Sequence, residues 1–302
     1  MRIEKPLIQA FLKKHALPES YQLVAEEYFF PLAQRICTQA LNSTQPIIVG
    51  VNGCQGSGKS TLTDLLVDLL TLQFNCPALG VSIDDFYLSR QDRLNLARDI
   101  HPLFKTRGVP GTHNIGLMQD TLLKLKTGIV PTAIPAFNKA IDDPYPPSQW
   151  TTVEERVKVI LFEGWCVGAQ PQSELELASP VNEFEQSEDA DAVWRNYSNK
   201  MLAGEYQAIF SLLDRMVMLK APGFYAVKGW RSEQEHKLRA RVIACNGDMS
   251  SVMSDAEVER FIQHYERITE NCFAHLPDKT DDLFLLDDQR KIKEVIVKEV
   301  AR

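Results

Sequence analysis

The chain has 302 residues, of which 44% are hydrophobic, and its 33 basic and 40 acidic side chains give a net charge of −7. That length fits one large domain or a core domain with an extension, and the hydrophobic fraction is enough for a sizeable core. The acidic balance argues against a protein whose main task is to bind nucleic acid or an anionic membrane. A small anionic ligand stays open, because backbone amides and a few lysines can bind phosphate on an acidic protein.

Membrane and disulfide-rich classes are also disfavoured. No window approaches 18 consecutive apolar residues, and the charged N-terminus lacks the apolar stretch of a signal peptide. The six cysteines are far apart and form no C-x-x-C pair, so neither a zinc framework nor a disulfide scaffold is indicated. We therefore expect a cytoplasmic protein that is a monomer or a small homo-oligomer.

Along the chain, helical spacing of apolar residues alternates with short apolar runs that are typical of buried parallel strands. After a helical stretch at 5–43, the strands are expected at 46–51, 78–83, 157–162, 215–219, 283–286 and 292–297. The helices between them are expected at 59–72, 90–99, 117–126, 192–213, 229–241 and 255–273. This alternation predicts an α/β fold with a mostly parallel sheet and helices on both faces.

Three stretches interrupt the alternation. Residues 101–116 are rich in Gly, Pro and His, which indicates an ordered loop, and residues 131–152 contain five prolines and little periodicity. Residues 170–190 are acidic and polar, and we expect them to form a mobile surface loop.

The strongest motif is GCQGSGKS at residues 53–60, a full match to G-x-x-x-x-G-K-S/T between an expected strand and an expected helix. Such a loop turns successive backbone amides toward one phosphate, while its lysine reaches the β- and γ-phosphates and its hydroxyl binds Mg²⁺. We expect ATP and Mg²⁺ here, and a three-layer sandwich of the P-loop NTPase type. The candidate nucleotide-binding residues are Gly53, Cys54, Gln55, Gly56, Ser57, Gly58, Lys59, Ser60 and Thr61.

Acidic residues stand where two expected strands end. Glu163 ends the run 157–162, and Asp84 and Asp85 follow the run 78–83. In an open α/β sheet, ligands collect at the carboxyl ends of the strands. We therefore expect Glu163 on the metal side together with Ser60, and Asp84 as a base for an attacking hydroxyl.

Several longer stretches carry a family resemblance. They are DDFYLSRQDRLNLAR (84–98), HPLFKTRGVPGTHN (101–114), PAFNKAIDDPYP (135–146), LFEGWCVG (161–168) and GWRSEQEHKLR (229–239). Together they resemble the plant-type D-glycerate 3-kinases and their bacterial and fungal relatives. These belong to the P-loop kinases of the phosphoribulokinase, uridine kinase and pantothenate kinase group. The glycine loop identifies only the superfamily, whereas R-G-x-P-G-T-H is far more specific.

The resemblance implies an ATP-dependent kinase for a small hydroxyl acceptor, D-glycerate first. It implies Asp84 as the base, also close to the metal, with Glu163 on the metal side and Arg231 as a lid arginine at the transferring phosphate. It further implies an acceptor contact for Lys139 and suggests others for Asp85 and Tyr87. By this reading, residues 1–44 are a helical extension of a kinase domain at 45–302. The domain contains an acceptor-side region at 101–152, an insertion at 170–210 and a lid at 229–260.

The residues of the 101–114 loop favour an acidic acceptor by themselves. Arg107 and His113 flank a turn at 108–111, and an arginine binds a carboxylate through two hydrogen bonds. Asn138 and Pro144 differ from the Asp and Arg usual in the resembling family. Two alternatives therefore remain open. One is a kinase of the same group for a nucleoside, pantothenate or a sugar, and the other is a slow ATPase that regulates a partner.

Overall fold

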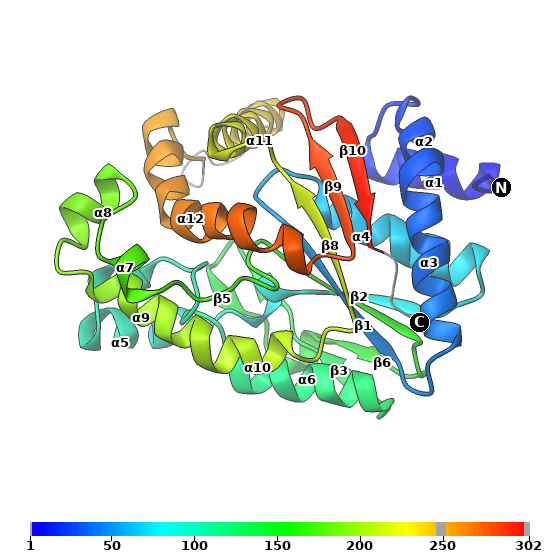
Figure 1. The fold of residues 1–302 in the computed structure, drawn as a ribbon, viewed down its shortest axis with the longest axis horizontal. Helices are drawn as coiled ribbons and strands as arrows, with labels where there is room; N and C mark the ends of the chain where they lie inside the picture. The colour runs from blue at the N-terminus through cyan, green and yellow to red at the C-terminus, as the bar shows by residue number, and fades with distance from the viewer. Residues whose placement is uncertain (1, 246–251, 299–302) are drawn as a thin grey trace.

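A six-stranded sheet forms the centre of the protein, and the computed structural model, which describes residues 2–245 and 252–298, places helices against both faces (Figure 1). Its strands are β1 (Ile47–Gly53), β2 (Ala78–Ser82), β7 (Val159–Gly164), β8 (Arg215–Lys220), β9 (Asp282–Leu286) and β10 (Ile292–Val297). Their order is β10-β9-β8-β1-β7-β2, and only β10 runs antiparallel to its neighbour. The predicted α/β fold with a mostly parallel sheet is confirmed.

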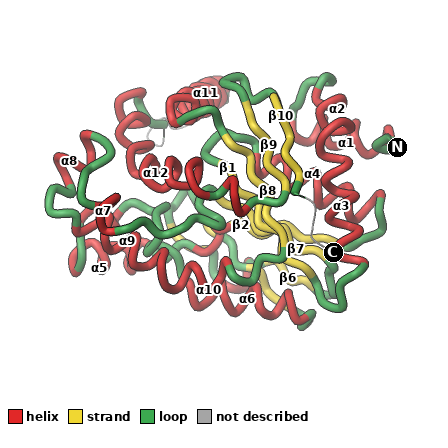
Figure 2. The backbone as a smooth tube through the Cα atoms, in the orientation of Figure 1, coloured by secondary structure: helices red, strands yellow, loops and turns green. Residues whose placement is uncertain are grey.

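The helices surround the sheet in the tube view as well (Figure 2). They are α1 (Lys5–His15), α2 (Tyr21–Val24), α3 (Phe30–Leu41), α4 (Lys59–Asp68), α5 (Arg90–Asp99), α6 (Ile115–Thr127), α7 (Glu174–Leu177), α8 (Glu183–Glu188), α9 (Val193–Met201), α10 (Gln207–Phe210), α11 (Phe224–Ala244) and α12 (Asp255–His275). Within the described ranges, no helix has the length and apolar content needed to cross a membrane.

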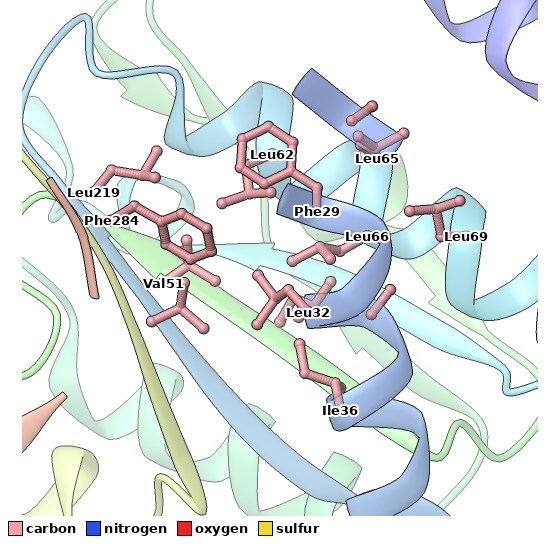
Figure 3. Packing of buried hydrophobic residues seen from close by; sticks show 14 of the residues in the cluster. Phe29, Leu32, Ile36, Val51, Leu62, Leu65, Leu66, Leu69, Leu219 and Phe284 are labelled. Atoms are coloured by element: carbon pink, nitrogen blue, oxygen red, sulfur yellow. The ribbon is translucent and has the colours of Figure 1, made fainter. Parts of the chain in front are cut away.

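The strands bury both of their faces, which explains their continuous apolar sequence. In β1, Ile47, Val49 and Val51 belong to one apolar cluster, whereas Ile48, between the first two, belongs to a second cluster on the opposite face. The first cluster includes Leu62 from α4 and Phe284 from β9, and Figure 3 shows their side chains meeting over the sheet. Because successive side chains of a strand point to opposite faces, one short strand supports two cores.

The N-terminal helices contribute to the first of these cores. Phe29, Leu32 and Ile36 come from the helical run that ends in α3, and each is at most 5% exposed. Figure 3 shows them against Val51 and Leu66. This part of residues 1–44 therefore covers one face of the central sheet.

The prediction of a mobile surface loop at 170–190 is wrong. The segment contains α7 and α8, and its Glu185 is fully buried and accepts hydrogen bonds from Arg267 at 2.6 and 2.7 Å. Asp189 is also buried and pairs with Arg195 at 3.0 Å. A buried carboxylate requires a charged or hydrogen-bonding partner, and both partners here lie outside the acidic segment. The composition of the segment by itself does not show these partners, and for that reason it resembles the composition of a solvated loop.

The proline-rich stretch 131–152 also has more order than its sequence indicates. β3 (Thr132–Ile134) pairs with β6 (Thr151–Val153), and β4 (Phe137–Asn138) pairs with β5 (Asp143–Pro144). Strands of two or three residues are too short to show a periodic pattern. The β4–β5 hairpin matters for the site, because its tip carries Lys139.

Candidate active site

The glycine loop connects a fully buried strand to a helix. β1 ends at Gly53, and α4 begins at Lys59 directly after Gly58, whose φ is +92°. A Cβ on Gly53 would lie 2.5 Å from the Ser57 hydroxyl oxygen, so the loop folds back tightly on its own first residue. Among the described residues, the buried Ser57 hydroxyl has no hydrogen-bond partner. This is the geometry that binds an anion at a helix N-terminus.

Cys54 lies inside this loop, but its surroundings do not make its thiol reactive. It is 2% exposed, and burial raises its pKa to about 12 despite the nearby charge of Lys59. Since the thiolate is the reactive form, Cys54 serves here as a small buried side chain.

Glu163 lies beside the glycine loop because of the strand register. It is a residue of β7 itself and aligns with Val51 of β1 on one side and Ser82 of β2 on the other. The Ser60 hydroxyl donates a hydrogen bond of 3.0 Å to its Oε1, while its Oε2 is buried without a partner in the described parts of the chain. The predicted pair of Ser60 and Glu163 is thus brought together, with one carboxylate oxygen left over.

This donor set fits a magnesium ion. No group of three or more His, Cys, Asp or Glu side chains within the described ranges could hold a metal by itself. Mg²⁺ does not require such a group, because it keeps several waters and binds phosphate oxygens beside one or two protein ligands. A hydroxyl and a buried carboxylate oxygen beside a phosphate loop meet that requirement.

Asp84 follows β2 in a tight turn, 83–86, whose first amides are capped by Ser82. Its carboxylate accepts a 2.8 Å hydrogen bond from the Tyr87 hydroxyl and a 2.6 Å hydrogen bond from Lys139. Burial raises the pKa of Asp84, but the charges of Lys139 and Lys59 and the Tyr87 hydroxyl outweigh it and lower that pKa to about 2. Asp84 is therefore ionised at neutral pH, and its side chain is still 30% exposed.

Asp85 points in another direction and has the opposite electrostatics. Its Oδ1 accepts a 3.3 Å hydrogen bond from the backbone amide of Phe137, which ties the turn to the β4–β5 hairpin. Burial, helped by the charge of Asp84, raises the pKa of Asp85 to about 6. Its observed contact is structural, although the sequence suggests an acceptor contact.

Arg107 and Lys139, the two expected acceptor cations, are both paired within the protein. Lys139 is bound to Asp84, and Arg107 is bound to Asp142 with its guanidinium 5.5 Å above the Phe137 ring. Asp142 is held from the other side by Arg93 at 2.8 Å. The side chain of Arg93 is 1% exposed. The sequence analysis missed Arg93, because an arginine on a polar helix gives no sign that it is buried.

His113 lies against Tyr87, with ring centroids 4.6 Å apart and planes tilted by 27°. The hydroxyl of Tyr206 lies 2.5 Å from its Nδ1 and also accepts the amide hydrogen of Gly111 at 3.1 Å. A hydroxyl has one hydrogen and two acceptor positions, so the Tyr206 hydroxyl can donate to Nδ1 or accept from it while it accepts the Gly111 amide hydrogen. Burial lowers the pKa of His113 to about 4, which keeps the ring neutral.

Tyr206 is the second residue that the sequence analysis missed. It comes from the insertion at 170–210, 93 residues after His113, and no spacing rule connects the two. His113 itself is placed locally, because the next residue, Asn114, caps α6 through a 3.1 Å bond from the Leu117 amide.

Arg231 does not reach the glycine loop in this structure. Its guanidinium pairs with Glu235 at 2.8 Å and lies 5.7 Å above the Phe261 ring, so it links α11 to α12. Residues 246–251 of the expected lid lie outside the described residues. Of the expected lid, residues 229–244 belong to α11 and residues 255–260 to α12, and these two helices contact each other beside the sheet (Figure 1).

No family model matches the chain, but comparison with known proteins finds relatives. It is 34% identical over 230 residues to the uncharacterized kinase mug58 of Schizosaccharomyces pombe, which covers 73% of this chain and 79% of that protein. It is 30% identical over 229 residues to the chloroplastic D-glycerate 3-kinase of Arabidopsis thaliana, spanning 73% of this chain but only 46% of that protein.

Solved structures agree on the fold. The D-glycerate 3-kinase of Cryptococcus neoformans superimposes with a TM-score of 0.74, covering 89% of this chain and 99% of that one at 24% identity. The YGR205w protein superimposes with a TM-score of 0.67, covering 91% and 100% at 21% identity. At these identities the likeness supports the fold, and the predicted P-loop kinase architecture is confirmed.

Proposed function

The chain belongs to the family of P-loop kinases that includes the Schizosaccharomyces pombe kinase mug58, and we propose that it transfers the γ-phosphate of ATP to a hydroxyl of D-glycerate. The observation that carries the choice of acceptor is the direct contact between Asp84 and Lys139, 2.6 Å apart at the edge of the glycine loop. A short hydroxy acid can bring a hydroxyl to Asp84 and its carboxylate to Lys139 at the same time.

The nucleotide side holds the phosphates through Gly53–Thr61. Backbone amides of the loop and the N-terminus of α4 bind the phosphate oxygens, and Lys59 neutralises the charge that develops at the γ-phosphate. Ser60 and Glu163 would hold Mg²⁺. When bound, that ion supplies positive charge to the β- and γ-phosphates and so stabilises charge in the transition state.

The acceptor side positions the attacking hydroxyl. Asp84 accepts the hydroxyl hydrogen, the hydroxyl oxygen forms the new O–P bond, and the bond between the γ-phosphorus and the ADP oxygen breaks. With a pKa of about 2, Asp84 is a weak base. It therefore acts mainly by orienting the hydroxyl until the forming bond has made that proton acidic, as suits a loose transition state.

The anionic end of the acceptor requires donors. Lys139 would exchange part of its contact with Asp84 for the substrate carboxylate. We propose that the Tyr206 hydroxyl donates to Nδ1, so that the Nε2–H of neutral His113 is an additional donor beside Tyr87. This nitrogen is buried and has no partner among the described residues. Arg107 would contact the substrate carboxylate only by releasing Asp142. We therefore assign it a smaller part in binding that carboxylate than Lys139 and His113.

The lid assignment remains part of the proposal. Closing α11 and the start of α12 over the nucleotide would exclude water, which a kinase needs to avoid hydrolysing ATP. We further propose that residues 45–302 form the kinase domain and that the enzyme works in the cytoplasm as a monomer or a small homo-oligomer.

An acceptor screen tests the function. Purified protein is incubated with ATP and Mg²⁺ and, in separate reactions, D-glycerate, L-glycerate, other hydroxy acids, uridine, a sugar and pantothenate, with product detection by mass. We expect phosphoglycerate from D-glycerate and slow ATP hydrolysis without acceptor. Turnover of uridine or pantothenate without phosphoglycerate would overturn the glycerate assignment. ATP consumption that no acceptor stimulates would favour the regulatory ATPase.

A further inference from the structure

Three segments that are far apart in the sequence meet behind the glycine loop at Arg290. Its Nε donates a 2.8 Å hydrogen bond to the carbonyl oxygen of Gly56, and its Nη2 lies 2.7 Å from the carboxylate of Glu233 on α11. Its guanidinium also lies 5.2 Å from the centre of the Trp230 ring. One side chain thus contacts the phosphate loop and α11 together.

The connection between β9 and β10 holds Arg290 in an unusual conformation. Its φ is +65°, which side-chain-bearing residues seldom adopt. The Asp287 carboxylate fixes this turn by accepting the amide hydrogens of Gln289 and Lys291 at 2.9 and 2.8 Å. Figure 1 shows this connection beside α11. A strained residue persists only where its surroundings require it, which makes Arg290 a candidate for function.

Trp230 completes the contact between α11 and the loop. It is 3% exposed, and its indole donates a 2.7 Å hydrogen bond to the carbonyl of Asp288 in the same turn. A Cβ on Gly56, where φ is +77°, would lie only 2.7 Å from the Trp230 Cβ. The phosphate loop, α11 and the β9–β10 turn therefore form one packed unit.

We propose that Arg290 is a positioning residue for the nucleotide. By binding the Gly56 carbonyl oxygen, it keeps that oxygen turned away from the phosphates, so that the loop presents amide hydrogens to them. By pairing with Glu233 at the same time, it links the shape of the loop to the position of α11. This inference rests on the proposed binding of ATP at Gly53–Thr61.

Arginine suits this task better than lysine. Its planar fork can bind a carbonyl oxygen and a carboxylate in fixed directions while stacking on an aromatic ring, whereas a lysine offers a single charged nitrogen. A lysine at position 290 should therefore restore part of the function and an alanine none.

The test measures nucleotide and acceptor separately. MgADP binding by calorimetry, and the KM values for ATP and for the acceptor, are compared for wild type, Arg290→Ala and Arg290→Lys. Arg98→Ala, which removes an exposed arginine whose partners among the described residues are its helix neighbours Asp99 and Asn95, is the control. We expect Arg290→Ala to weaken MgADP binding about tenfold and to raise the KM for ATP in proportion. The acceptor KM should stay within about twofold, and Arg290→Lys should be intermediate.

A second variant keeps the proposal testable if Arg290→Ala does not fold. Glu233→Gln removes the ionic link to α11 but leaves the bond to Gly56 and the contacts of Trp230, so it should weaken MgADP binding by only about two- to threefold. Its effect should be smaller in the Arg290→Lys background if the two residues act through one contact, because a single ammonium nitrogen replaces the fork that binds Gly56 and Glu233 together. MgADP binding within twofold of wild type in every Arg290 variant overturns the inference while leaving the proposed kinase intact. Failure of the wild type to bind MgADP would instead overturn the proposed function.

Discussion

The proposed nucleotide side and the proposed acceptor side of this site are built in different ways. The proposed nucleotide side consists of nine consecutive residues, Gly53–Thr61, and the groups it offers are largely backbone amides and a helix N-terminus. The acceptor side joins Asp84, the 101–114 loop, the β4–β5 hairpin and Tyr206, and its groups are side chains held by other side chains.

This difference predicts that substitutions on the two sides should affect different steps. A change at a side chain of the acceptor side should alter the acceptor or the chemical step and leave the nucleotide alone. Only where tertiary contacts reach the glycine loop, as at Arg290, should a distant residue affect nucleotide binding. Two further changes test this separation and a third tests the electrostatics of the acceptor side, in order of decreasing effect.

Asp84→Asn should have the largest effect. The amide keeps the shape of the side chain but cannot accept the hydroxyl proton as a carboxylate does, so kcat should fall between about 10²- and 10⁴-fold. MgADP affinity should change less than about threefold, because the phosphates are held by backbone amides. Steady-state kinetics and calorimetry measure the two quantities.

Asp99→Asn serves as its control, because Asp99 is an exposed acid that pairs, in the part of the chain that the structure describes, only with Arg98. If Asp84→Asn retained a kcat near that of the control, Asp84 would not be the base. If it lost MgADP binding instead, the two sides would not be separable.

Tyr206→Phe should have an intermediate effect. Removing the hydroxyl leaves the Gly111 amide and the His113 Nδ1 without their partner, and it removes the contact that we propose holds the proton of His113 on Nε2. The acceptor KM should rise about tenfold with the KM for ATP unchanged, and ¹⁵N NMR of the His113 ring should reveal a mixture of tautomers.

Tyr197→Phe is a matched control. Tyr197 also lies close to Gly111, but its hydroxyl makes no hydrogen bond within the described residues. An unchanged acceptor KM in Tyr206→Phe would remove His113 from the acceptor site. A rise of the ATP KM in parallel would indicate a general structural role.

Asp85→Asn should have the smallest effect and should act on stability. An acid whose folded pKa of about 6 exceeds its unfolded value of 3.8 costs stability as the pH rises between those two values. Asparagine can still accept the Phe137 amide hydrogen without a charge. The variant should therefore be more stable than wild type by about 1–2 kcal/mol at pH 8 and equal to it near pH 4.

Urea unfolding at the two pH values measures this. Asp84→Asn provides the contrast, because the folded pKa of Asp84 is lowered to about 2 and its charge adds stability that is present above its unfolded pKa. The two neighbouring substitutions should thus change the stability at pH 8 in opposite directions. Destabilisation by both would mean that Asp85 is ionised and favourably paired.

The sequence by itself determined the features that depend on nearby residues. Glycines at fixed spacing before Lys59 define the phosphate loop, because loop and helix geometry follow from local backbone conformation. Apolar runs located the strands, and since carboxyl ends of parallel strands share one edge, Glu163 and Asp84 could be placed beside that loop. The longer family motifs added the acceptor region, including His113 and Lys139.

Only the tertiary structure decided how the charged and polar groups are paired. Arg107 is bound to Asp142 and Arg231 to Glu235, although both look like free cations in the sequence. The acids at 170–190 include two that are buried against Arg195 and Arg267, and Tyr206 and Arg290 reach the site across 93 and 234 residues. The physical reason is that the energy of an ionic or hydrogen-bonding group depends on burial and on its partner, and both are set by packing between distant segments.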